Sequence, residues 1–277
     1  MTDWSKVSAD GQTFVFADEG EGPLVMLIHG FPDTPHGWER ISAALVDAGY
    51  RAVRPWLRGY HPETIVEGRA YDMATIASDP IALLDALGEP EAVIVGHDWG
   101  GWIAFGAASF HSDRVPAVAA IGIPHQAVLP RDLPTLWDAR HFVGLNVPWA
   151  EWKVRRAGFA YLEKLYRRWA PAWHGPDRER CLVEARAAFA DPRVVKAAVD
   201  YYRALSPRTP PELKRRASVP GLVVAGTSDL AADVYERSAA MLGQGSETLI
   251  LDGAGHWPHR EREDAFIARL LEFLRTV

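Results

Sequence analysis

An aspartate stands where a sharp strand-to-helix turn would present a nucleophile. The sequence GHDWGG at residues 96–101 follows the apolar run Ala92–Val95 and precedes a helix-like stretch at 102–108. Glycines on both sides of Asp98 permit a turn too tight for larger side chains, and such a turn lifts its middle residue above the sheet. A carboxylate cannot become an alkoxide for acyl transfer, but it can attack an electrophilic sp³ carbon and form an ester. The pattern therefore predicts covalent catalysis by Asp98.

Water must break an aspartyl ester, and His256 is the predicted base for that step. His256 lies in the stretch GAGHW at 253–257, directly after the last predicted strand. Functional residues of open parallel sheets gather at the carboxyl ends of the strands. Histidine titrates near neutral pH, which suits a general base. Nine other histidines compete, but only His256 occupies the final loop.

The base needs a carboxylate that fixes its tautomer, and Asp229 is the best candidate. It follows the predicted strand at 221–225. A helix N-cap is the alternative role for Asp229, and Asp233 is the second candidate for the carboxylate. Asp252 is too near His256 in the sequence to face it easily.

An oxyanion hole is expected around Asp98, because hydrolysis passes through a tetrahedral carbon on its side chain. The predicted donors are two backbone N–H groups, one from Trp99 after the nucleophile and one from Phe31 in the sequence HGFP at 29–32. Pro32 would rigidify that loop, and its peptide bond is a candidate for the cis form.

Strands and helices alternate around these residues. A hairpin is expected at 7–16, with strands at 24–28, 52–53, 92–95, 118–122, 221–225 and 248–251 and helices at 38–48, 73–87, 232–242 and 261–274. This alternation predicts a mostly parallel sheet with helices on both faces. From 126 to 216 the sequence lacks a strand pattern, is rich in Trp and Arg and is typical of helices. We expect an α/β core formed by 1–125 and 217–277, with a helical insertion at 126–216.

Composition limits the classes of partner. The 277 residues, 48% of them hydrophobic, suffice for one large core. A net charge of −6 and the lack of a basic block argue against nucleic acid or an anionic membrane as partner. Cys181 is the single cysteine, so no disulfide within the chain is expected. We expect a cytoplasmic protein, because a signal peptide is not evident and no apolar run reaches the ~20 residues of a membrane span.

Together these motifs resemble those of the α/β-hydrolase-fold epoxide hydrolases. The resemblance rests on HGFP at 29–32, RGY at 58–60, GHDWGG at 96–101, PH at 124–125, YYR at 201–203 and GH at 255–256. It spans nearly the whole chain and is weaker at 126–216, which corresponds to the helical cap of the family. It implies the α/β-hydrolase fold, opening of an epoxide by Asp98, hydrolysis by water activated through His256 and release of a vicinal diol. Neither a cofactor nor a metal is implied.

The resemblance further implies that two cap side chains donate hydrogen bonds to the epoxide oxygen. Tyr202 matches the tyrosine that precedes an arginine in the family. The other donor, usually a tyrosine, falls on His141, because NVP at 146–148 stands where the family has Gln-x-Pro. A solvated surface histidine is the alternative for His141, and Tyr161 and Tyr166 are fallback donors.

Aromatic residues indicate the type of substrate. Trp99, Trp102 and Phe31 are expected to contact it. The predicted cap contains further tryptophans, which favour an apolar or aromatic epoxide unless they only pack the cap onto the core: Trp137, Trp149, Trp152, Trp169 and Trp173. The expected partners are this epoxide and water, and a homodimer is left open.

Two other functions are compatible with parts of the pattern. Haloalkane and haloacetate dehalogenases share the fold and the aspartate. The former usually carry Asn or Glu where Phe31 stands, and the latter place arginines after the nucleophile, where this chain has Trp99 and Trp102. A non-enzymatic receptor of similar fold usually lacks a catalytic residue, whereas all are present here. The sequence WLRGYH at 56–61 also departs from the family's usual Asp before Arg-Gly-Tyr-Gly.

Overall fold

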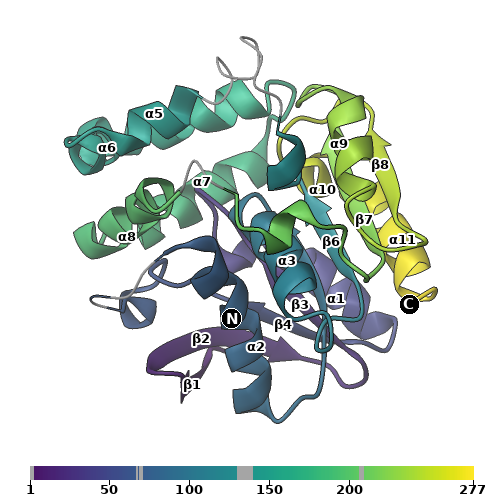
Figure 1. Cartoon of the computed structure of the whole chain (residues 1–277). Helices are drawn as coiled ribbons and strands as arrows, with labels where there is room; N and C mark the ends of the chain where they lie inside the picture. Colours follow the sequence, from purple (N-terminus) through teal and green to yellow (C-terminus); the bar gives the residue numbers. More distant parts are fainter. Residues whose placement is uncertain (1–2, 67, 69–70, 130–139, 206–208) are drawn as a thin grey trace.

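A twisted sheet runs through the centre of the molecule (Figure 1). The computed structural model describes residues 3–66, 68, 71–129, 140–205 and 209–277. Within these residues the sheet has eight strands in the order β1-β2-β4-β3-β5-β6-β7-β8. Their bounds are β1 Ser5–Ala9, β2 Gln12–Glu19, β3 Leu24–Ile28, β4 Arg51–Pro55, β5 Val93–His97, β6 Val118–Ile121, β7 Gly221–Gly226 and β8 Glu247–Leu251. The pairs of β2 with β1 and β4 are antiparallel, and the pairs from β4 to β8 are parallel.

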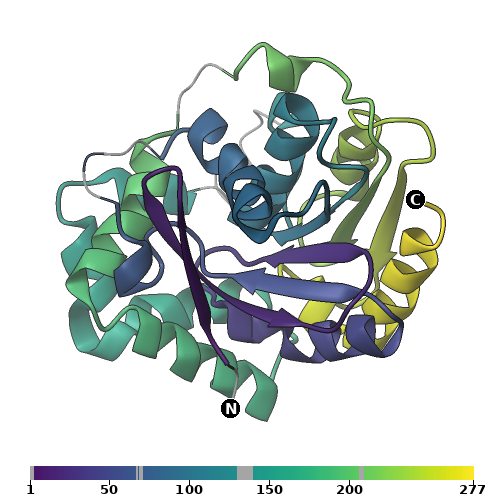
Figure 2. The same ribbon diagram turned by 90° about the horizontal axis from the view of Figure 1, so that it is seen from below.

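Helices cover both faces of the sheet (Figure 2). One face packs against α1 (Glu39–Asp47) and α11 (Glu263–Leu274), and the other packs against α2 (Met73–Leu87), α3 (Trp99–Phe110) and α9 (Ala232–Ala239). The strands explain this arrangement, because every residue of β3, LVMLI, and of β7, GLVVAG, is buried. Continuous apolar strands of this kind require cover on both sides.

Within the predicted insertion at residues 126–216, every regular element in the described part of the chain is a helix. The insertion contains η3 Gln126–Val128, α5 Arg140–Asn146, α6 Ala150–Trp169, α7 Pro176–Ala188, α8 Pro192–Arg203 and η4 Glu212–Lys214. Figure 1 shows α5, α6 and α8 gathered at one end of the molecule, above β1 and β2. None of the described helices combines the length and apolar character that crossing a bilayer requires.

Helix α6 is interrupted by a short left-handed turn. Ala157, Gly158 and Phe159 have φ values of 51°, 62° and 64°, and Arg156 is extended. L-residues adopt this region of φ rarely, so the turn is a defined break in the helix. We call residues 150–155 the outer half of α6 and residues 160–169 its inner half.

The predicted fold is confirmed, and most element bounds agree within a few residues. Helix α2 has the predicted bounds, 73–87. The helix after the sharp turn at Asp98 begins at Trp99, three residues earlier than expected, because the turn is completed within one residue. The helix expected at 261–274 is divided into α10 (Pro258–Glu261) and α11, because the backbone of Arg262 is not helical.

Candidate active site

Asp98 occupies a strained turn between β5 and α3. Its φ of 52° and ψ of −115° lie outside the regions that L-residues favour, which is typical of functional turns. The flanking glycines are required by space. A Cβ on Gly96 would lie 2.0 Å from the carbonyl oxygen of Gly100, and one on Gly100 would lie 2.1 Å from that of Ile28. The backbone thus holds the Asp98 carboxylate at the end of β5.

The loop after β3 provides a backbone donor to this carboxylate. The N–H of Phe31 donates to Oδ1 of Asp98 at 2.8 Å. The Phe31–Pro32 bond is cis, as expected. The N–H of Trp99 lies in the first turn of α3, where backbone donors have no intrahelical acceptor. The Phe31 N–H is thus within hydrogen-bond distance of the Asp98 side chain, and the oxyanion roles of Phe31 and Trp99 stay predictions.

His256 lies between two carboxylates. Its Nε2 is 3.4 Å from Oδ2 of Asp98, and its Nδ1 is 3.6 Å from Oδ2 of Asp229. These are ion-pair contacts, slightly longer than hydrogen bonds. The hydroxyl of Tyr235 donates to the same Asp229 oxygen at 2.9 Å and orients it.

The other two aspartates considered from the sequence lie elsewhere. Asp233 pairs with Arg237 at 3.1 Å, and Asp252 lies 3.5 Å from the Thr227 hydroxyl. Asp229 is also not the N-cap of α9, a position that Ala231 occupies. Of these three aspartates, Asp229 is the one that faces the base.

The charge of its neighbours determines the protonation of His256. Burial lowers the pKa of His256, but the interactions with Asp229 and Asp98 outweigh this effect and raise it to about 10. At neutral pH the resting site therefore holds an imidazolium between two carboxylates.

Backbone contacts fix the loop of His256 from three sides. The His256 N–H donates to the carbonyl of Trp169, at the end of α6, at 2.8 Å. Its carbonyl accepts a 2.8 Å hydrogen bond from Nε2 of His97, whose pKa burial lowers so that the ring stays neutral. One carboxylate oxygen of Glu261 accepts the N–H groups of Gly255 and Trp257. Sequence reasoning missed these residues, because contacts to backbone atoms leave no signature in residue type or spacing.

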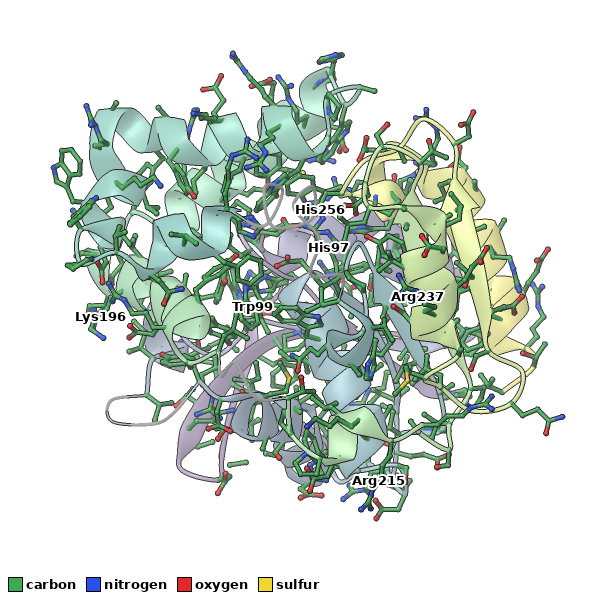
Figure 3. All side chains as sticks on the ribbon, turned by 45° about the horizontal axis from the view of Figure 1, so that its top comes forward. His97, Trp99, Lys196, Arg215, Arg237 and His256 are labelled. Carbon is green, nitrogen blue, oxygen red and sulfur yellow. The ribbon has the colours of Figure 1, made fainter. Side chains whose placement is uncertain are left out.

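A cavity of about 1020 Å³ opens over Asp98. Asp98, His141 and His256 line it, together with Trp99 and Trp102. Trp102 donates its indole N–H to the carbonyl of Pro124 at 2.9 Å, so Trp102 presents only the apolar part of its ring to the cavity. Figure 3 shows Trp99 and His256 beneath the helices of the insertion.

The cavity reaches the surface beside α5. Val143 and Leu129 line it and are 72% and 36% exposed. The mouth is therefore partly apolar.

Tyr202 packs against Trp99 and His141, which line this cavity, but it is not itself one of the lining residues. Its ring contacts those of Trp99, Phe31 and His141, with centroids 5.2, 5.4 and 6.0 Å apart. Its hydroxyl is buried and makes no hydrogen bond of normal geometry to the described residues. Burial, and then the charge of Asp98, raise the pKa of Tyr202 well above its usual value, and an interaction with the Trp99 side chain lowers this pKa only slightly, so the phenol keeps its proton.

The fallback tyrosines lie elsewhere. Tyr166 donates its hydroxyl to the carbonyl of Pro32 at 3.1 Å and stacks on Trp257 at 4.3 Å. Tyr161 lies under the ammonium group of Lys153, 4.6 Å from its ring centroid, and burial raises the pKa of Tyr161 to about 12. Tyr166 therefore attaches the insertion to the loop at residues 29–32.

Two expectations about aromatic contacts need correction. Phe31 does not line the cavity, because its side chain is fully buried against Phe189 and Tyr202. Of the tryptophans in the insertion, Trp169 faces the cavity, whereas Trp173 packs on Trp257. Trp149 and Trp152 are each 60% exposed, and Trp137 lies outside the described residues.

This chain is similar to known proteins along nearly its whole length. The model of the alpha/beta hydrolase fold family matches residues 23–263. Epoxide hydrolase A of Mycobacterium tuberculosis is 32% identical, over 94% of this chain and 92% of that protein. The AB hydrolase superfamily protein YfhM of Bacillus subtilis is 29% identical, over 98% and 97% of the two chains. The crystal structure of epoxide hydrolase A from Mycobacterium thermoresistibile superposes with a TM-score of 0.83 and 28% identity, covering 99% of this chain and 98% of that one.

Proposed function

This chain belongs to the α/β-hydrolase fold family and, within it, to the epoxide hydrolases, and on that premise we propose that it converts an apolar or aromatic epoxide into a vicinal diol. The observation that carries the proposal is the carboxylate of Asp98 at the elbow, with His256 at 3.4 Å. A carboxylate nucleophile suits attack on an sp³ carbon. In this proposal the insertion at 126–216 acts as the cap.

The first step is alkylation of Asp98. A carboxylate oxygen attacks an epoxide carbon, a C–O ester bond forms and the ring C–O bond breaks. The epoxide oxygen becomes an alkoxide that needs a proton, and the buried phenol of Tyr202 and the His141 ring supply hydrogen bonds to it. The Tyr202 hydroxyl, which makes no hydrogen bond of normal geometry to the described residues, supports this role, as does the position of His141 in the cavity wall.

The second step is hydrolysis of the ester. Alkylation removes the negative charge of Asp98, which is one of the interactions that raise the pKa of His256. The imidazolium then loses its proton more easily, and this proton neutralises the alkoxide. Neutral His256 takes a proton from water, the hydroxide attacks the ester carbon, and the Phe31 N–H stabilises the oxyanion. Collapse of that intermediate releases the diol and restores the carboxylate.

The leaving group distinguishes this reaction from dehalogenation. A departing halide needs donors but no proton. Trp102 has already committed its indole N–H to Pro124, which leaves one donor fewer for a halide. The buried phenol of Tyr202 instead suits a basic alkoxide.

A side-by-side assay tests the proposal. Styrene oxide and 1-bromobutane are supplied separately, and diol and bromide are followed. We expect diol and no bromide, and a single turnover in ¹⁸O-water should place the label in Asp98. Label that appears first in the diol would mean that water attacks the epoxide directly.

A further inference from the structure

Charge is divided unevenly between the insertion and the rest of the chain. Residues 126–216 contain eighteen Lys and Arg residues and ten Asp and Glu residues, a net charge of +8. Because the whole chain carries −6, the remainder carries −14. The low overall charge, which argues against an anionic surface as partner, is thus an average over two regions of opposite sign.

The basic excess is concentrated on α5 and α6. Residues 140–169 contain seven Lys and Arg residues and two glutamates. Both glutamates are neutralised by arginines, since Glu151 pairs with Arg203 at 2.6 Å and Glu163 with Arg186 at 3.0 Å. Arg155 and Arg156 are exposed and have no carboxylate partner within the described part of the chain.

Exposed apolar side chains accompany these arginines. Trp149 and Trp152 lie three residues apart at the start of α6, so they share one helix face, and each is 60% exposed. The Arg156 guanidinium stacks over the Trp152 ring at 4.5 Å. Val143 on α5 is 72% exposed and forms part of the cavity mouth. We call Trp149, Trp152, Arg155 and Arg156 the basic-aromatic face; Val143 lies on the preceding helix, α5.

We propose that the basic-aromatic face docks the protein on an anionic lipid bilayer. Indole rings favour the headgroup region of a membrane, and basic side chains beside them are attracted by anionic lipids. The inner half of α6 stays attached to the core, so the outer half and α5 can meet the surface without unfolding. Docking there brings the partly apolar cavity mouth to the lipid, where apolar molecules accumulate.

A second copy of the chain fits this face less well. In a twofold dimer the same patch meets itself. Such a contact would bring unpaired arginines of both copies together, and like charges repel. An anionic bilayer supplies the opposite sign over the whole face.

Vesicle co-sedimentation tests the proposal. The full-length protein is mixed with vesicles of phosphatidylcholine alone, or of phosphatidylcholine with phosphatidylglycerol. We expect binding to the anionic vesicles only, and binding that weakens as salt is added. Arg155→Glu/Arg156→Glu and Trp149→Ser/Trp152→Ser should each weaken it by at least about tenfold, because basic and aromatic contacts both contribute.

Matched controls carry the same chemical changes away from this face. Arg215→Glu/Arg237→Glu reverses two charges outside the helices of α5 and α6 (Figure 3), and Val183→Ser removes an exposed apolar side chain from α7. These variants should bind vesicles like the wild type. Equal weakening by the controls, or equal binding to neutral vesicles, would overturn the proposal.

Two further measurements separate the alternatives. Light scattering that shows a dimer lost on Trp149→Ser/Trp152→Ser, with vesicle binding unchanged, would assign the face to a second copy and overturn the proposal. Turnover of dissolved styrene oxide should be unchanged in all these variants. That assay reports on the proposed catalysis, so its failure is distinguishable from a failure to bind lipid.

Discussion

The outer and inner halves of α6 differ in what they contact. In the outer half, Trp152 and Arg155 are exposed, and only Ala150 and Val154 are buried. The inner half touches both loops of the candidate active site, through the Tyr166 hydroxyl on Pro32 and the Trp169 carbonyl on the His256 N–H. One helix thus joins a solvent-facing surface to a segment that holds catalytic loops, and the left-handed turn between them lets the two halves face different surroundings.

Substitution of His256, in the loop that the inner half of α6 holds, should have the largest effect on turnover. We expect His256→Gln to slow turnover by about 10⁴ or more, as loss of a triad base does, because water is no longer activated. Alkylation of Asp98 should persist, so intact-protein mass spectrometry should detect an adduct with the mass of the epoxide. Normal turnover by this variant would remove His256 from the mechanism.

Substitution of the two proposed ring-opening donors, Tyr202 and His141, should have the next largest effect on turnover. Tyr202→Phe should slow alkylation by about 10²–10³, because one hydrogen bond to the developing alkoxide is lost. His141→Phe should have a similar effect, and the double variant should nearly abolish ring opening. Rapid-quench kinetics separate alkylation from hydrolysis, which should change little. An alkylation rate within about twofold of the wild type for Tyr202→Phe would favour a dehalogenase.

The stability of the fold should depend on pH, because the positive charge of His256 lies between the carboxylates of Asp98 and Asp229. The pKa of folded His256 is raised to about 10, above its unfolded value of about 6.5. The proton on folded His256 therefore stabilises the fold fully below pH ~6.5 and ceases to do so as the pH rises through ~10. The free energy of unfolding of the wild type, relative to His256→Gln, should fall by about 1–3 kcal/mol over that range in urea titrations. A constant difference would contradict the raised pKa.

The Tyr166 hydroxyl should have a smaller effect. Tyr166→Phe removes the hydrogen bond to Pro32 and should cost about 0.5–1.5 kcal/mol of stability. The loop at residues 29–32, which carries the proposed oxyanion donor Phe31, should loosen, so kcat should fall severalfold with KM little changed. Tyr161→Phe is the control, because its hydroxyl does not touch that loop. If Tyr161→Phe lowered the alkylation rate more than Tyr166→Phe does, Tyr161 would instead be a ring-opening donor.

The smallest effect should come from the outer half. Trp149→Ser/Trp152→Ser should leave kcat and KM for a dissolved epoxide within about twofold of the wild type, because neither side chain lines the cavity. Initial rates with styrene oxide check this. A large loss would mean that the outer half also shapes the catalytic loops, and the contrast between the two halves would fail.

The core and the reactive side chains were predictable because each follows a local signal. Asp98 and His256 end up together because parallel strands deliver their carboxyl ends to one edge, so position along the chain implies proximity. The glycines around Asp98 and the HGFP loop mark backbone geometry that few sequences adopt. These features need no knowledge of distant packing.

What could not be predicted depends on packing between distant segments. The His256 N–H donates to the backbone carbonyl of Trp169, and any residue type at position 169 would supply that carbonyl. The sequence therefore does not indicate this hydrogen bond. The side-chain position of Phe31 depends on the insertion residues Phe189 and Tyr202, which enclose its ring. Tryptophan content likewise does not tell which rings face the cavity and which face solvent.

The Trp169 carbonyl also limits how this lineage could diversify. An α-helix turns by about 100° and rises about 1.5 Å per residue, so a one-residue insertion or deletion within 160–169 would swing this carbonyl away from the His256 N–H. Length changes before the left-handed turn would leave that register intact. Relatives that exchange or remodel the outer part of the insertion, by recombination or by design, should therefore keep activity only when the last ten residues of α6 keep their length.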